Sequence, residues 1–172
     1  MTGDNTLIHS HGINRRDFMK LCAALAATMG LSSKAAAEMA ESVTNPQRPP
    51  VIWIGAQECT GCTESFAQVD APDPATVVLE MISLNYCETL SAAAGWSMEE
   101  AKAQTIEAGN YILIYEGAVL EGWNGEALRV ANEPGTEHLI HAAENANAVV
   151  ALGSCAVNGG WMGANPNSSG AL

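Results

Sequence analysis

Two cysteines stand close together directly after an apolar run of β-forming residues. The run covers residues 51–54 and stops at Gly55, and Cys59 and Cys62 follow in a C-x-x-C spacing with Gly61 between them. Such a run is typical of a buried strand, and the glycine allows a tight turn between the two thiols. Two thiols at the carboxyl end of a strand can form a redox disulfide or bind a metal or a cluster. The C-x-x-C spacing alone does not distinguish these options, so the other residues of the chain are needed.

A third cysteine stands in the same position relative to another apolar run. Residues 148–152 predict a buried strand that leads into Gly153-Ser154-Cys155. In a parallel sheet the carboxyl ends of the strands share one edge, and binding sites form outside that edge. We therefore expect Cys59, Cys62 and Cys155 to meet at one rim of the sheet.

Strands and helices alternate along the part of the chain that carries these cysteines. Strands are expected at 51–54, 76–84, 111–115 and 148–152, although the first half of 76–84 has a helical alternative. A Ser97–Glu100 capping box predicts a helix that ends near Gly109, and Thr136 is expected to cap a helix that ends near residue 145. Residues 85–95 and 122–134 are expected to be irregular. The pattern predicts an α/β fold with a parallel sheet covered by helices on both faces.

The second helix is expected to place three apolar residues on one face, namely Leu139, Ile140 and Ala143.

Composition excludes some partners. The chain has 172 residues, 48% of them apolar, which is enough for one core of ordinary size. The 19 acidic residues outnumber the 7 basic ones and give a net charge of −12. Nucleic acid and anionic membrane surfaces both recruit Lys and Arg, so neither is expected as a partner.

The amino-terminal residues have the features of an export signal. Paired arginines at 15–16 precede an apolar run that is too short to cross a bilayer, and small residues at 35–37 offer a cleavage point. Residues 15–20 resemble a twin-arginine signal, with an ordinary secretory signal as the alternative. We expect a signal at 1–37, a linker or extended arm at 38–50, and a folded domain at 51–172. Cysteines of exported proteins usually form disulfides, but the twin-arginine resemblance implies folding around a cofactor before export.

Four segments together resemble one protein family. Residues 49–66 resemble the opening of the small subunit of nickel–iron hydrogenases, and residues 82–86, 115–118 and 153–160 follow in that family's order. The resemblance implies a flavodoxin-like domain with a proximal [4Fe–4S] cluster bound by Cys59, Cys62 and Cys155. It also implies that H2 is cleaved at the nickel–iron site of a separate large subunit, that this chain conducts the electrons, and that the chain alone is inactive.

The resemblance implies a location and further partners. The expected location is the periplasm, with electrons passing to a downstream carrier subunit or cytochrome and with membrane association through partners. The family's fourth proximal ligand lies in a Gly-Cys-Pro-Pro segment, and its medial and distal clusters, a [3Fe–4S] and a second [4Fe–4S], lie in a further domain. Neither occurs before Leu172, so a truncated chain is expected. Gly61 and Gly160 stand where some oxygen-tolerant members have extra cysteines, which implies the ordinary cubane.

Other residues have a functional and a structural interpretation. Glu58 and Glu64 flank the cysteines and could contact the large subunit or serve a proton route, or they are solvated carboxylates. Cys87 is either a substitute fourth ligand or a buried apolar residue. His138 and His141 have a metal-binding spacing on one helix, but packing or surface histidines are commoner.

Three alternatives to the hydrogenase interpretation remain open. A thiol–disulfide oxidoreductase would use Cys59 and Cys62 but leaves Cys155 without a role. The cluster-bearing subunit of respiratory NADH:quinone oxidoreductase is related, but it typically has adjacent cysteines and no export signal. The third alternative is a truncated or chimeric α/β domain without activity of its own.

Overall fold

The computed structural model describes residues 20, 24, 32, 34 and 48–172. The expected signal, its cleavage point and most of the expected arm lie outside these residues. Pro49–Leu172 forms one compact unit, which is the part described below. None of the described helices is long and apolar enough to cross a membrane.

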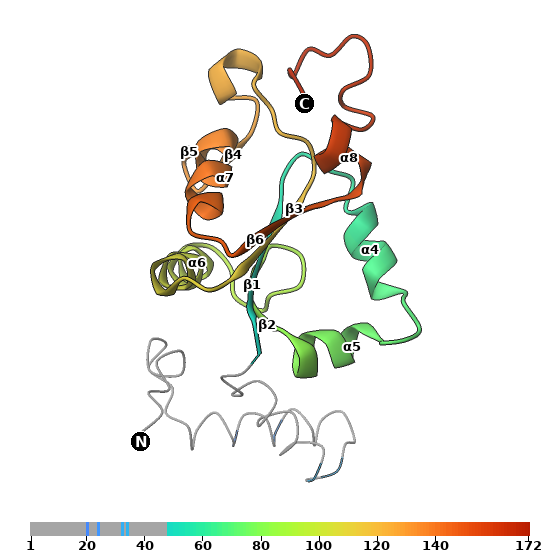
Figure 1. Ribbon diagram of the computed structural model, residues 1–172, viewed down its shortest axis with the longest axis vertical. Helices are drawn as coiled ribbons and strands as arrows, with labels where there is room; N and C mark the ends of the chain where they lie inside the picture. Colours follow the sequence, from blue (N-terminus) through green and yellow to red (C-terminus); the bar gives the residue numbers. More distant parts are fainter. Residues whose placement is uncertain (1–19, 21–23, 25–31, 33, 35–47) are drawn as a thin grey trace. The chain divides into compact units, whose positions relative to one another are not determined.

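The centre of the unit is a parallel, four-stranded sheet with the order β2-β1-β3-β6 (Figure 1). The elements in chain order are β1 (Pro50–Gly55), α4 (Gly61–Ala67), α5 (Pro74–Thr76), the π-helix η1 (Val77–Met81), β2 (Ser83–Cys87), α6 (Trp96–Ala108), β3 (Ile112–Glu116), the 3₁₀ helix η2 (Gly122–Gly125), the hairpin strands β4 (Arg129–Val130) and β5 (Glu133–Pro134), α7 (Gly135–Glu144), β6 (Ala148–Leu152) and α8 (Gly153–Asn158).

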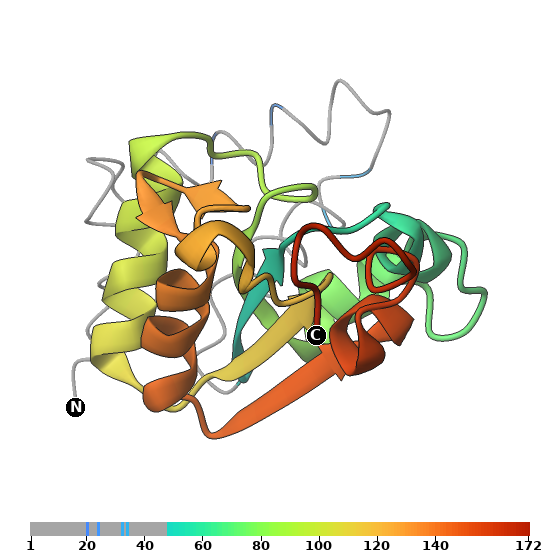
Figure 2. The ribbon, with the colours of Figure 1, turned by 90° about the horizontal axis from the view of Figure 1, so that it is seen from above.

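Helices cover both faces of the sheet, as expected. Helices α6 and α7 lie on one face, and α4, α5 and α8 lie on the other (Figures 1 and 2). The chain runs from β1 outward to β2, then returns to β3 on the other side of β1 and continues to β6. The direction of winding therefore changes between β1 and β3, and such switch points carry the sites of doubly wound sheets.

The core lies mainly around the two central strands. Ile52, Ile54 and Leu113 are fully buried and pack with Tyr86 and Tyr111 in one cluster. Central strands of a parallel sheet are buried on both faces, which explains why β1 is apolar at every position from 51 to 54. Ala118, Leu120, Met162 and Ala171 form a smaller cluster near the carboxyl end of the chain.

The strand expected over the first half of residues 76–84 was wrong, and the helical alternative for that half is confirmed. Residues 74–81 are helical, and the strand β2 runs from Ser83 to Cys87, into a stretch expected to be irregular. The helical start has a clear cause: Pro74 follows Asp73, whose carboxylate accepts hydrogen bonds from Thr76 N (3.1 Å) and Thr76 Oγ1 (2.7 Å). A capped start of this kind overrides the β preference of the valines that follow.

Both longer helices occur where expected, but their predicted caps were wrong. Helix α6 is preceded by Gly95, and the Ser97 hydroxyl donates back to the Ala94 carbonyl instead of capping. Helix α7 begins at Gly135 after Pro134, with Thr136 inside the helix.

The predicted apolar face of α7 was only partly right. Leu139 and Ala143 pack against the core, whereas Ile140 is 56% exposed. The buried positions of α7 are instead Gly135, at its first residue, and His138 and Ala142, one helical turn apart.

The sheet is less completely covered than its apolar strands predicted. Strand β6 is an edge strand, and among the described residues it pairs only with β3. Its residues are exposed from Ala148 to Ala151, with Val149 at 53% and Val150 at 42%. An apolar sequence therefore marks β6 as a strand without placing it inside the core.

Candidate metal centre

Two loops from the carboxyl ends of β1 and β6 bring the candidate thiols together. Cys59 and Cys62 lie in the loop after β1 and at the start of α4, and Cys155 lies in α8, directly after β6. Helices α4 and α8 lie side by side in both ribbon views (Figures 1 and 2), and the three cysteines are free thiols. Strands β1 and β6 are not neighbours, since β3 lies between them. The chain-distant thiols thus converge on the rim that the sequence predicted.

Glycines make room for each thiol. A Cβ on Gly153 would overlap with Cys62 Sγ, so the Cys62 thiol lies against the backbone at the end of β6, just before Cys155. A Cβ on Gly160 would stand 2.7 Å from Cys155 Sγ. Gly153 and Gly160 also have positive φ angles of 79° and 54°, which L-residues rarely adopt. The rim is therefore a cradle for sulfur atoms that larger residues at these positions would close.

The thiols are close enough to influence one another electrostatically. Burial raises the pKa of the Cys62 thiol, and the charges of Glu116, Cys155 and Cys59 raise the pKa further. The three thiols therefore share one electrostatic environment, and a thiol–disulfide oxidoreductase that uses Cys59 and Cys62 leaves the third of them, Cys155, without a role.

Glu116, at the end of β3, holds the cysteine loop in place, a role that the sequence pattern does not indicate. Its side chain is 2% exposed. One carboxylate oxygen accepts hydrogen bonds from the backbone N–H groups of Cys62 (3.1 Å) and Thr63 (3.2 Å). The other accepts from Thr63 Oγ1 (2.6 Å) and from Trp53 Nε1 (3.1 Å). A carboxylate with four donors is fully satisfied in a buried position, and it fixes the start of α4 to β1 and β3.

Trp53 is a core residue, as expected, and its indole N–H adds a polar anchor for Glu116. The sequence feature that could have pointed to Glu116 is its position as an acidic residue at the end of an otherwise apolar strand, 112–116.

The loop after β1 crosses the loop after β3 at the switch point. Ala56 N donates to the Glu116 carbonyl (2.7 Å), and Ala118 N donates to the Gln57 carbonyl (3.0 Å). Gly117, with φ 111°, lies between these bonds, and a Cβ there would stand 2.9 Å from the Gln57 carbonyl oxygen. The crossing therefore requires glycine at position 117 and fixes the path of the chain toward Cys59.

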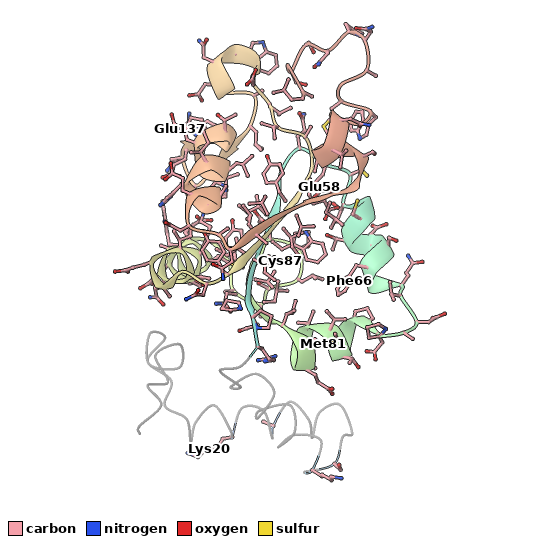
Figure 3. The ribbon with its side chains drawn as sticks, viewed as in Figure 1. Lys20, Glu58, Phe66, Met81, Cys87 and Glu137 are labelled. Carbon is pink, nitrogen blue, oxygen red and sulfur yellow. The ribbon has the colours of Figure 1, made fainter. Side chains whose placement is uncertain are left out.

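The two acidic residues beside the cysteines differ in environment. Glu64 is exposed on α4, whereas Glu58 is half-buried in the loop after β1 (labelled in Figure 3). Thr60 Oγ1 donates to Glu58 Oε1 (3.3 Å), and Glu58 Oε2 is buried without a hydrogen-bond partner. Burial and the charge of Glu116 raise the pKa of Glu58. Only Glu58 therefore has an unmet hydrogen-bonding demand.

Cys87 and the histidine pair have structural environments. Cys87 is 1% exposed at the end of β2, and its thiol lies 3.3 Å from Thr89 Oγ1. His138 is buried and accepts a hydrogen bond from Lys102, whereas His141 is exposed. Among the described residues, no three His, Cys, Asp or Glu side chains are grouped to bind a single metal ion.

The fold and the rim together define a class of protein: an α/β domain wound like flavodoxin, with cysteines gathered at the switch side of the sheet. The sequence model of the family described as "NADH ubiquinone oxidoreductase, 20 Kd subunit" matches residues 59–172, and the chain belongs to this family.

Curated relatives narrow the comparison to hydrogenase small subunits. The chain is 63% identical over 174 residues to the Hydrogenase-2 small chain of Escherichia coli K12, covering 100% of this chain and 47% of that one. It is 40% identical over 160 residues to the periplasmic [NiFe] hydrogenase small subunit of Solidesulfovibrio fructosivorans, covering 92% of this chain and 51% of that one. The chain therefore spans about half the length of the curated relatives it matches.

Solved structures agree on the fold. The [NiFeSe] hydrogenase of Desulfovibrio vulgaris Hildenborough matches with a TM-score of 0.69 and 32% identity, over 76% of this chain and 48% of that one. The resemblance of this chain to a hydrogenase small subunit is thus confirmed, as is the α/β fold.

Proposed function

We propose that this chain is the electron-transferring small subunit of a nickel–iron hydrogenase and binds a proximal [4Fe–4S] cluster through Cys59, Cys62 and Cys155. The observation that carries the proposal is the convergence of thiols from β1 and β6 on one rim, with Gly153 leaving room for the Cys62 sulfur. Cysteine thiolates are the usual ligands of such clusters. The similarity to hydrogenase small chains, which covers all of this chain and about half of theirs, supports the same assignment.

The residues present fit such a group. Three free thiols lie at one rim, where Gly153 and Gly160 leave room for the sulfur atoms of Cys62 and Cys155, and a [4Fe–4S] cluster takes four thiolates. Cys87 is not a fourth ligand in this arrangement, because it is buried at the end of β2 and pairs with Thr89. The proposed fourth ligand therefore belongs to the Gly-Cys-Pro-Pro segment of related proteins.

The cluster, when bound, supplies one-electron redox chemistry for H2 ⇌ 2H⁺ + 2e⁻, whose bond cleavage belongs to the large subunit. The chain's own residues set the surroundings of the thiols. Glu116 fixes the backbone of Cys62, and its negative charge favours the oxidised, less negative state of a group bound there. The glycines at 153 and 160 keep side chains away from the sulfur atoms.

The partner in this proposal is the hydrogenase large subunit, docked over the cysteine rim. Two large apolar residues that follow Cys155 in the chain, Val157 and Trp161, are about two-thirds exposed, at 67% and 66%. Exposed apolar residues of this size mark protein contacts. Glu58 Oε2, which is buried without a hydrogen-bond partner, is proposed to accept a hydrogen bond from the large subunit, and Glu64 is a second candidate contact. The proposed location is the periplasm, reached by twin-arginine export, with electrons passing to a downstream carrier.

The test is anaerobic co-expression with the large chain of Hydrogenase-2, followed by co-purification, iron and acid-labile sulfide analysis and electron paramagnetic resonance. The wild-type chain is expected to co-purify with iron and sulfide. Cys59→Ser, Cys62→Ser and Cys155→Ser are each expected to lose most of the iron, while Cys87→Ser is the matched control and keeps it.

Two results would overturn the proposal. If the Cys155→Ser variant retains the wild-type iron content, the convergence of the two loops does not form the site. If the wild-type chain co-purifies without iron and sulfide, the chain is an α/β domain without this redox function.

A further inference from the structure

A pocket opens beside the start of α6, on the β2 side of the sheet. It has a volume of about 410 Å³, and its walls come from the chain around the end of β2, the first turn of α6 and the hairpin β4–β5, which lies beside α6 in Figure 2. The lining combines the carboxylates of Glu88 and Glu99 with the aromatic rings of Tyr86 and Trp96. Among the described residues that line the pocket, none is basic. Such a lining suits a group with an apolar stem and a positively charged end.

The Tyr86 hydroxyl shows that the pocket is short of one hydrogen-bond donor. It lies 3.0 Å from Glu88 Oε1 and 3.0 Å from Glu99 Oε1. Burial raises the pKa of the Tyr86 phenol, and the charges of Glu88 and Glu99 raise it further, so the phenol keeps its proton. Because it has only one proton, it donates fully to only one of the two carboxylates. The other carboxylate oxygen is left to accept a donor from outside.

The two carboxylates of the pocket outnumber the cation beside them. The Lys102 ammonium pairs with Glu99 and balances one negative charge. The basic residue of the hairpin, Arg129, pairs with Glu126 instead. Within the described part of the chain, no Lys or Arg forms an ion pair with Glu88, whose residue is exposed. The pocket therefore has one accessible negative charge for a cation that the chain itself does not supply.

The pocket lies at the same edge of the sheet as the cysteines. Glu88 directly follows β2, as the loop to Cys59 follows β1, and the carboxyl ends of parallel strands share one edge. The two loops are in contact there, because the N–H of Gly55, the last residue of β1, donates to Glu88 Oε2 (3.0 Å). Trp96, the first residue of α6, is 73% exposed beside them. A protein docked over the cysteine rim is thus adjacent to the pocket.

We propose that this pocket receives a basic side chain of the hydrogenase large subunit. The cation of that side chain donates to the Glu88 carboxylate beside Glu99, and its apolar stem packs along Trp96. Tryptophan rings attract cations to their faces, and the stems of Arg and Lys pack on apolar surface. Charge complementarity and continuity with the proposed docking rim favour this occupant. The inference extends the proposed function and rests on it for the identity of the partner.

The first test places a photo-crosslinker in the pocket of the assembled complex. The tagged chain carries p-benzoylphenylalanine in place of Trp96 and is co-expressed with the large chain of Hydrogenase-2. Irradiation is expected to link the two chains, and mass spectrometry of the linked peptide is expected to find an Arg or Lys at or next to the linked residue. The same replacement at Glu107, which is exposed near the other end of α6, is the matched control and is expected to give no link.

The second test measures what the charge of Glu88 contributes to docking. A tagged variant and the untagged wild-type chain are co-expressed with a limiting amount of the large chain, and the share of the large chain that each one holds is measured. Glu88→Gln keeps the shape of the side chain but removes its charge, and it is expected to lower the ratio of variant to wild type in the complex by about tenfold or more. Glu100→Gln, at an exposed position of α6, is the matched control and is expected to hold an equal share.

The outcomes separate this inference from the proposed function. A complex that holds iron and sulfide but gives no link from position 96 overturns the pocket contact and leaves the proposed function standing. An equal share for Glu88→Gln, or a link between two copies of this chain, overturns the contact as well. A link in a complex without iron and sulfide supports the contact and overturns the cluster assignment, and a wild-type chain that does not co-purify with the large chain overturns both. Circular dichroism checks that Glu88→Gln folds, and the link from position 96 keeps the inference decidable if it does not.

Discussion

Replacing Glu116 by alanine is expected to remove the strongest polar anchor between the sheet and the cysteine loop. The substitution leaves the N–H groups of Cys62 and Thr63, the Thr63 hydroxyl and the Trp53 indole N–H without their acceptor. A hydrogen bond to a charged group contributes about 1.5–3 kcal/mol, and an unsatisfied buried donor costs about 1–3 kcal/mol. Water entering the vacated space recovers part of this, so a net loss of about 4 kcal/mol is expected.

That loss is large compared with the stability of a domain. Unfolding free energies of domains are about 5–15 kcal/mol. Glu116→Ala is therefore expected to lower the urea concentration at the unfolding midpoint strongly, with little change in the slope m of free energy against urea concentration. The assay is equilibrium unfolding in urea, followed by tryptophan fluorescence, since Trp53 is one of the donors. Glu64→Ala is the matched control: it removes an exposed carboxylate from the same helix, and surface changes of this kind stay within about 0.5 kcal/mol.

A loss below about 1 kcal/mol in Glu116→Ala would refute the reasoning, because four donors to one buried carboxylate cannot then be the anchor of the loop. A loss of the same size in Glu64→Ala would show a general effect of charge rather than these bonds.

Two further predictions concern the glycine cradle and the buried histidine. Gly153→Ala is expected to destabilise the chain by about 2 kcal/mol more than Gly109→Ala. Both positions have a positive φ, but only Gly153 lies against the Cys62 thiol. Thermal unfolding of the two variants measures the difference, and equal losses of stability would contradict this prediction. His138 has a pKa of about 4 when folded against about 6.5 when unfolded, so the unfolded chain binds more protons between these values. The contribution of neutral His138 to the free energy of unfolding is therefore fully present above pH 6.5. It falls by about 3 kcal/mol as the pH is lowered to about 4. Urea titrations at several pH values are expected to show this slope in the wild type and in His141→Gln but not in His138→Gln, and an unchanged slope in His138→Gln would contradict the assignment.

The sequence predicted the parts of the site that depend on topology. Apolar runs followed by cysteines give strand ends, and parallel winding brings strand ends to one edge, so the meeting of Cys62 and Cys155 needed no three-dimensional information. The helical start at Asp73 was not predicted as such, because the β-forming valines after it gave the stronger signal and only the structure shows the cap.

The residues that the sequence pattern does not indicate act through contacts between elements. Glu116 stood at the end of an apolar strand, and nothing in its neighbours along the chain indicates that Trp53 and Thr63 donate to it. The same holds for Tyr86, whose hydroxyl reaches Glu99 on α6. Polar networks of this kind depend on side chains from distant segments, so spacing along the sequence does not reveal them.

The bare edge of β6 has a consequence for handling the chain by itself. Among the described residues, strand β6 pairs along one side only, and Val149 and Val150, on opposite faces of the strand, are both exposed. Edges of this kind recruit strands from other molecules, and a single lysine on them is a common natural safeguard. The isolated chain is therefore expected to precipitate through intermolecular β-structure as its concentration rises, and a Val150→Lys substitution to keep it dispersed.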